Sequence, residues 1–221
     1  MKKIVKSLYR ITVLSVVFFS FSKSIYAQGN RAGGCMNTDF ISDISKSDLS
    51  EEEKAGLILM REEEKLARDV YVTLGEKWNL PMFSNIHRAE QIHSDAVKAL
   101  LDRYDLEDPI KNDATGIFTS PELSGLYKKL VDMGSASLMD ALKVGATIED
   151  LDIKDLNELL VKTDNEDIKV TYKFLNKGSR NHMRAFSRQI TNRGGAYTPQ
   201  YISNAEYENI ISSSHERGNV R

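Results

Sequence analysis

A carboxylate and a histidine in the first half of the chain have the spacing of a metal-ligand pair. Glu90 and His93 are three residues apart, so on a helix their side chains lie on one face, about one turn apart. Ile86, Ala89 and Val97 fall on the same face, which turns the pair toward the apolar side of the helix. A lone Glu-x-x-His is nevertheless a weak signal, because four-residue coincidences are common, and by itself it favours a surface pair.

Three consecutive glutamates offer further carboxylates upstream. Glu62, Glu63 and Glu64 would by default form a solvated helix face. Three consecutive helical residues span about 200°, however, and an apolar stripe covers more than about 100°. At least one of the three side chains must therefore lie at or near the stripe. Glu64 aligns with Tyr71 and Glu63 aligns with Val70, so the spacing favours Glu64 and leaves Glu63 as the alternative.

Ionisable residues also fall on the apolar stripes of the second half. Glu149 follows a run of inward-facing positions, and Asp152 comes one turn later. His182 lies among apolar residues, one turn after Ser179, and Gly178 stands beside that serine. A glycine inside a helix costs about 1 kcal/mol relative to alanine, which indicates close packing or room for another group. Taken alone, His182 is more often a hydrogen-bonded core histidine than a ligand.

Together these positions predict a metal centre. A buried ionised carboxylate is costly unless it is paired, hydrogen-bonded or bound to a metal. A set of carboxylates with two imidazoles, spread over four helices, is the ligand mixture of a di-iron or di-manganese carboxylate site in a helical bundle. The expected ligands are Glu64, Glu90, His93, Glu149, Asp152 and His182. Iron is the expected metal, as two ions, with manganese or a single ion as alternatives.

Helices are predicted to position these residues. The expected helices run from the Ser50 capping box to about Trp78, from about Ser84 to Tyr104, from Pro121 to about Gly134, from Ser135 or Ser137 past Leu160, and from Asp164 or Asn165 past Phe186. A polar crossover, residues 105–119, separates the first two helices from the rest, and Ser203 with Glu206 caps a last short helix. The pattern predicts an all-α fold, a ferritin-like four-helix bundle with a long crossover and extra short helices.

The sequence around the candidate ligands resembles rubrerythrins and ferritins. Glu64, with Ala three and Tyr seven residues later, resembles their first metal helix, and Glu90-Gln-Ile-His93 resembles the Glu-x-x-His of the second. Glu149-Asp-Leu-Asp152 resembles the third-helix carboxylate pair of rubrerythrins. The longer strings EEKLARDVY (residues 63–71) and GSRNH (residues 178–182) resemble an uncharacterised prokaryotic ferritin-like family over about residues 50–201. The resemblance implies a di-iron oxidoreductase that reacts with oxygen or peroxide, as a ferroxidase or peroxidase, without identifying a catalytic residue.

The chain departs from this pattern at the fourth metal helix. Rubrerythrins carry Glu-x-x-His there, whereas this chain has Ser179-Arg-Asn-His182. Three outcomes stay open: Asp152 substitutes for the missing carboxylate, one metal is weakly held, or a single metal binds. The chain also lacks a CxxC pair and hence a rubredoxin-like module, so a peroxidase would need an external reductant. The alternative function is therefore a non-catalytic metal-binding or structural bundle of the cell envelope, with one metal or none.

Composition excludes several other classes. With 30 Lys+Arg against 32 Asp+Glu, the chain lacks the excess of positive charge that is typical of nucleic-acid-binding proteins. The single cysteine, Cys35, cannot form an intrachain disulfide or a cysteine metal site. A glycosidase with paired carboxylates is disfavoured because Trp78 is the sole tryptophan and the sequence shows no other sign of sugar-binding aromatics.

The N-terminal residues have the three parts of a secretory signal peptide. Residues 1–27 contain a basic start, an apolar run at 11–21 and a small residue, Ala27, at the cleavage position. We expect cleavage there, an exported protein in the periplasm or outside the cell, and no stable membrane span afterwards; an uncleaved anchor is the alternative. The mature chain would then comprise a polar lead (28–49), the helical bundle (50–193) and a C-terminal tail (194–221) with a short helix.

Overall fold

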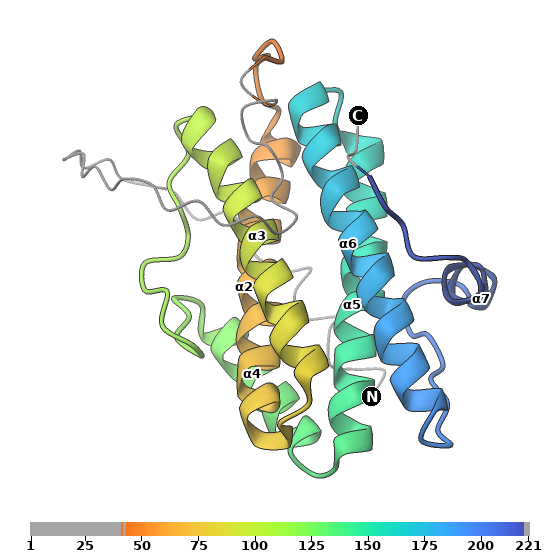
Figure 1. The fold of residues 1–221 in the computed structure, drawn as a ribbon. Coiled ribbons are helices and arrows are strands. Elements are labelled where there is room, and N and C mark those ends of the chain that lie inside the picture. The colour runs from red at the N-terminus through yellow and green to blue at the C-terminus, as the bar shows by residue number, and fades with distance from the viewer. Residues whose placement is uncertain (1–40, 42, 219–221) are drawn as a thin grey trace. The chain divides into compact units, whose positions relative to one another are not determined.

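The computed structural model describes residue 41 and residues 43–218, and within this part every regular element is a helix (Figure 1). The helices are α2 (Glu51–Trp78), α3 (Pro81–Arg103), α4 (Pro121–Gly134), α5 (Leu138–Lys162), α6 (Glu166–Thr191) and α7 (Asn204–Ser212). The predicted all-α class is confirmed for these residues. The predicted signal peptide and residues 28–40 of the polar lead lie outside them. None of the described helices is both long enough and apolar enough to cross a membrane.

Local sequence signals set the helix ends. Ser50 Oγ accepts a hydrogen bond from the Glu53 N–H, and the Glu53 carboxylate accepts one from the Ser50 N–H, which is the predicted capping box. Asn79 ends α2 in the left-handed conformation, with φ 48°. The start expected near Ser84 was wrong: α3 begins at Pro81, because a proline at the first helical position has no N–H to leave unpaired. Ser137, Asn165 and Ser203 immediately precede α5, α6 and α7.

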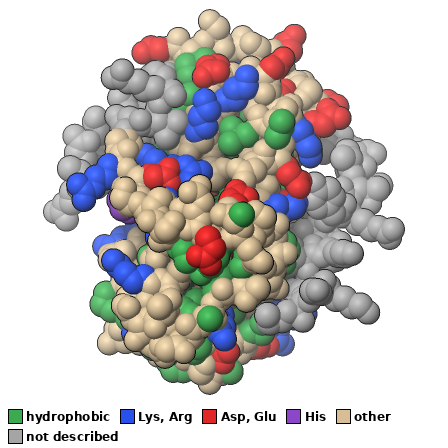
Figure 2. Space-filling view, turned by 90° about the vertical axis from the view of Figure 1, so that its right-hand side faces the viewer, with side chains coloured by type: hydrophobic (Ala, Val, Ile, Leu, Met, Phe, Trp, Pro, Cys, Tyr) green, Lys and Arg blue, Asp and Glu red, His purple; other side chains and the backbone are tan. Residues whose placement is uncertain are grey.

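Four long helices enclose the interior. α2 packs against α3 and α5, and α6 packs against the same two helices, so each of the four contacts two others. The shorter α4 packs on α2 and α5, and α7 packs on α6 (Figure 1). On the face drawn in Figure 2, Lys and Arg side chains are interspersed with Asp and Glu.

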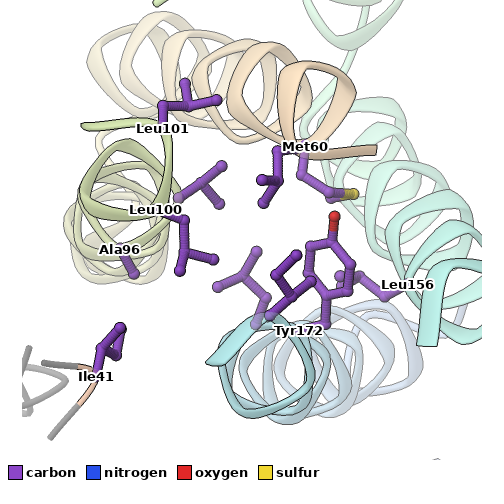
Figure 3. Close-up of a cluster of buried hydrophobic side chains, with 11 residues drawn as sticks. Ile41, Met60, Ala96, Leu100, Leu101, Leu156 and Tyr172 are labelled. Carbon is purple, nitrogen blue, oxygen red and sulfur yellow. The ribbon is translucent and has the colours of Figure 1, made fainter. Parts of the chain in front are cut away.

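Apolar side chains fill the interior at two levels. At one level, side chains from α2, α3, α5 and α6 converge on a cluster that includes Met60, Leu100, Leu156 and Tyr172 (Figure 3). At the other level, the rings of Tyr71, Phe83 and Phe186 lie 5.4 to 6.1 Å apart, centroid to centroid. Along α2, α3 and α6 the candidate ligands come between these two levels in sequence. The fold therefore places a polar layer between two apolar ones.

A buried ion network ties the crossover to α2. The Lys65 ammonium donates to the Asp69 carboxylate and to the carbonyl oxygen of Ala114, 3.1 Å away. The Gly116 N–H donates to Asp69 Oδ2 at 2.9 Å. Lys65 and Asp69 are both fully buried, since the crossover covers this side of α2. The connection between the two helical pairs is thus fixed to the helix that carries Glu64.

Candidate metal centre

All six predicted ligands are buried in the polar layer. They are Glu64 from α2, Glu90 and His93 from α3, Glu149 and Asp152 from α5, and His182 from α6. The most exposed of them, His182, has a relative exposure of 9%. Because each of the four long helices supplies at least one of these side chains, the layer exists only when all four pack together.

The first group of possible ligand atoms comes from Glu64, Glu90 and His93. One ligand atom of each residue lies within 4.8 Å of the others. His93 Nδ1 is 2.8 Å from Glu90 Oε2 and 3.2 Å from Glu64 Oε2. Of the two glutamates that the sequence left open, Glu64 thus joins the group.

The second group comes from Glu90, Glu149 and His182, again within 4.8 Å of one another. His182 Nδ1 is 2.9 Å from Glu90 Oε1 and 3.4 Å from Glu149 Oε2. Glu90 therefore belongs to both groups, and each of its oxygens faces a different histidine. A carboxylate with this disposition can bridge two metal ions.

Several atoms in the two groups are buried without a hydrogen-bond partner. They are Glu64 Oε1, Glu90 Oε1, Glu149 Oε2 and His182 Nδ1. The short distance between His182 Nδ1 and Glu90 Oε1 does not form an aligned hydrogen bond. Leaving a buried polar atom unpaired costs about 1–3 kcal/mol, and a bound cation would relieve that cost. The donor set, carboxylate oxygens with imidazole nitrogens, suits iron and manganese.

Burial favours the protonated forms of three of these carboxyl groups in the metal-free protein. It raises the pKa of Glu64 to about 8, although the nearby His93 acts in the opposite direction. It raises the pKa of Glu149 to about 7, again against the effect of His182. The pKa of Asp152 is well above its usual range because of burial and the negative charges of Glu149 and Glu64. Cations at this position would replace protons.

For the two histidines and Glu90, the surroundings favour the charged form instead. Burial by itself would lower the pKa of His93, but Glu64 and Glu90 outweigh it and raise that pKa to about 9. Glu90 and Glu149 likewise raise the pKa of His182 well above its usual value, against the effect of burial. Burial would raise the pKa of Glu90, yet the two histidines hold it well below its usual range. Glu90 is therefore the charged centre of the layer.

Tyr71 orients one of the carboxylates. Its hydroxyl donates a hydrogen bond of 2.6 Å to Glu149 Oε1, while its ring packs against Phe83 and Phe186. With Oε1 held in this way, the other oxygen of Glu149 faces His182. The tyrosine is therefore both a core residue and a support for a candidate ligand.

Gly178 makes room for His93. A Cβ atom at Gly178 would clash with Cε1 and Nε2 of the His93 ring. The same ring stands edge-on to Phe174, with centroids 5.3 Å apart, and lies 5.6 Å from the ring of His182. The close packing that the sequence indicated at this glycine is confirmed, and the partner is a candidate ligand.

We expect Gly178→Ala to weaken metal binding at least about tenfold, the size of effect typical when the support of a ligand is lost. The added methyl group displaces the His93 ring from its place between α3 and α6. The matched control is Gly125→Ala in α4, where a Cβ would meet nothing within 4 Å. Titration with Mn²⁺ measures the affinity of both variants. Unchanged affinity in Gly178→Ala would contradict the assigned role of His93.

Three other residues are placed outside the two groups. Asp152 is buried beside them but belongs to neither. Ser179 is buried and its hydroxyl donates to the Leu175 carbonyl oxygen of its own helix, at 3.2 Å. Glu63 is buried as well, although the spacing required only one of the glutamates to face inward. Each group thus consists of ligand atoms from three residues, and Glu90 belongs to both groups.

Comparisons with known proteins relate the chain to an uncharacterised family. The model of an uncharacterized protein domain (DUF2202) matches residues 53–214, a range that includes all six predicted ligands. The uncharacterized protein MJ0754 of Methanocaldococcus jannaschii is 63% identical over 180 residues, which cover 81% of this chain and 97% of that protein. The crystal structure of hypothetical protein MJ0754 from Methanococcus jannaschii matches with 64% identity and a TM-score of 0.77, over 78% of this chain and 99% of that one.

Proposed function

This chain belongs to the family of the uncharacterized protein domain DUF2202, and we propose that its buried Glu–His layer is a dinuclear iron centre in a ferritin-like four-helix bundle. The observation that carries the proposal is the position of Glu90. Its two oxygens face two different histidines, and a second carboxylate lies opposite on each side. Four of the atoms in these two groups are buried without a hydrogen-bond partner, and bound cations would satisfy them.

Each metal ion would have its own set of protein ligands. Glu64, Glu90 and His93 would hold one ion, and Glu90, Glu149 and His182 would hold the other. Three protein residues on each ion leave positions for small molecules, as in iron sites that react with oxygen. Asp152 is the adjacent carboxylate that would compensate for the glutamate missing at Ser179. Manganese suits the same ligands and is the alternative metal.

The proposed chemistry is oxidation of ferrous iron by dioxygen or peroxide. When bound, an iron pair supplies one electron from each ion to the oxidant and becomes ferric. The chain's own residues hold the ions, keep water out with apolar layers on both sides, and orient Glu149 through Tyr71. Protons leave Glu64 and His93 as metal binds, because in the metal-free protein their pKa values are raised. The activity is that of a ferroxidase or, with an external reductant, a peroxidase.

Oxidation of bound iron tests this function. Wild-type protein is loaded anaerobically with Fe²⁺ and then mixed with oxygenated buffer. Its near-ultraviolet absorption should increase as the bound iron becomes ferric. His93→Ala should lose this signal, whereas His87→Ala, a half-buried histidine of the same helix, should retain it. Loaded protein that stays ferrous under oxygen would contradict the redox proposal.

The alternative is a non-catalytic metal-binding or structural bundle. The observation that favours it is Ser179, which supplies no ligand atom where a rubrerythrin carries glutamate. Under this alternative the protein binds one metal ion or two without oxidising them, and the absorption experiment shows binding without a ferric signal. For either function, residues 1–27 support an exported location.

A further inference from the structure

The C-terminal segment, residues 197–218, is held against the two helices that supply Glu149 and His182 to the second ligand group. After α6 the chain crosses to α5, forms α7 and returns along α6 (Figure 1). One set of hydrogen bonds holds the segment on each helix. Both sets involve a direct sequence neighbour of a candidate ligand, since Asp150 follows Glu149 and Asn181 precedes His182.

Asp150 holds the first part of the segment on α5. Its buried carboxylate accepts hydrogen bonds from the N–H of Ile202 at 2.9 Å, from the N–H of Tyr201 at 3.2 Å and from the hydroxyl of Tyr197 at 2.8 Å. Adjacent residues of a helix point about 100° apart. With Asp150 bonded on the side of α5 that the segment covers, Glu149 is directed toward the interior.

Glu216 holds the end of the segment on α6. Its carboxylate accepts hydrogen bonds from Arg180 at 2.8 and 2.6 Å and from Arg184 at 2.8 Å. Its N–H donates to Asn181 Oδ1 at 2.9 Å, and Asn181 Nδ2 donates to its carbonyl oxygen at 3.1 Å. Because these three residues lie on either side of His182 in the sequence, the contacts fix the rotation of the turn that carries this ligand.

The first ligand group is held by a different part of the chain. Lys65, the neighbour of Glu64, bonds to Asp69 and to the crossover, and both side chains are at most 1% exposed. The side chains of Arg180 and Glu216 are 29% and 30% exposed. Ion pairs that water reaches are individually weak and are screened by salt. The contacts of the C-terminal segment can therefore open while those of the crossover remain.

We propose that the C-terminal segment is a clamp for the second metal ion. Its docking on α5 and α6 sets the positions of Glu149 and His182, and its release lowers the affinity for that ion while the ion beside Glu64 and His93 stays bound. The inference rests on the proposed function, and Glu216 is the positioning residue that it adds. Coupling between two binding equilibria is reciprocal, so the second ion must also stabilise the docked segment.

Mn²⁺ is the probe for this coupling, because it suits these ligands and its paramagnetic resonance distinguishes an isolated ion from a coupled pair. Wild-type protein should bind two ions as a pair. Glu216→Ala removes the bonds to both arginines, so the affinity for the second ion should fall about tenfold, the size of effect typical when the support of a ligand is lost. The variant should then show an isolated ion at Mn²⁺ concentrations that give the pair in wild type. Glu208→Ala, at an exposed glutamate of α7, is the matched control and should behave as wild type.

Hydrogen exchange at the Glu216 N–H measures the coupling in the other direction. Mn²⁺ should slow this exchange in wild type, because the N–H donates to Asn181 when the segment is docked. His93→Ala keeps the ligands of the second ion and should show the same slowing. His182→Ala loses one of them and should show none.

The outcomes separate this inference from the dinuclear proposal. A folded Glu216→Ala variant that binds both ions with wild-type affinity overturns the inference, and so does one in which both affinities fall equally. A wild type that binds the pair without any slowing of exchange at Glu216 overturns it as well. A wild type that binds no ion contradicts the proposed function instead. Thermal melts of each metal-free variant confirm that it is folded.

Discussion

Glu90→Gln is expected to abolish binding of both metal ions. Each oxygen of this carboxylate lies within 2.9 Å of the Nδ1 atom of a different histidine, so Glu90 is common to the two ligand groups. The amide is the same size, but its NH₂ group carries no lone pair for a metal and its oxygen carries no charge. Affinity for the ion that faces the NH₂ group should fall below detection, and the other ion should follow.

The matched control for this variant is Asp95→Asn, an exposed carboxylate of the same helix. His93→Ala should have a smaller effect than Glu90→Gln, because His93 belongs to one ligand group alone. Its loss should mainly remove the ion beside Glu64. Metal content after dialysis against Fe²⁺ or Mn²⁺ measures all three variants. The metal-free Glu90→Gln protein should also be less stable, since both histidines lose their charged partner. Near-wild-type metal content in Glu90→Gln would refute the bridging role.

The second large effect is a fall in the stability of the metal-free protein as pH rises from about 6 to about 9. Folding raises the pKa of Glu64 from 4.5 to about 8 and that of Glu149 from 4.5 to about 7. It raises the pKa of His93 from 6.5 to about 9. The folded state therefore binds more protons than the unfolded state over this range, and the free energy of unfolding decreases as those protons are lost.

Glu90 does not reverse this trend. Its pKa is lowered on folding, so its contribution is complete above the usual value of 4.5 and stays constant from pH 6 upward. Metal binding requires deprotonated ligands, so the stabilisation that metal confers should increase over the same range. Thermal melts at several pH values, with chelator and with Mn²⁺, measure both trends. Glu64→Gln should flatten the metal-free curve, and a metal-free melting temperature that rises with pH would contradict the assignment.

The helices were predictable because their ends depend on local chemistry. The Ser50 capping box, Pro121 after Ser120, and Ser203 before Glu206 each act within one turn of the chain. The start of α3 was misplaced by three residues, since no side chain caps it and Pro81 alone marks it. Tertiary contacts were not needed for any of these ends, which explains why sequence patterns located them.

The inward positions of the candidate ligands were predictable because helical periodicity determines which side chains face the interior. The choice between Glu63 and Glu64 was not, because adjacent residues point about 100° apart and a wide stripe includes both. Both are buried in the structure: Glu64 contacts His93 of α3, whereas neither oxygen of Glu63 has a hydrogen-bond partner. A helix that packs against two neighbours has two inward faces.

Other features depend on contacts that periodicity does not encode. Lys65 and Asp69 are buried because the crossover folds over α2, and sequence spacing says nothing about which helix a connection covers. The position of Glu90 between two histidines depends on the register of α3 against α6. Gly178 was the single local signal of that register, because its missing side chain leaves space for His93.

Anomalous diffraction from crystals loaded anaerobically with Fe²⁺ tests the dinuclear centre most directly. We expect two peaks in the polar layer, about 3.5–4 Å apart, as in other two-metal sites. One should lie among Glu64, Glu90 and His93, and the other among Glu90, Glu149 and His182. A single peak on one side of Glu90, or no peak between α2, α3, α5 and α6, would contradict it.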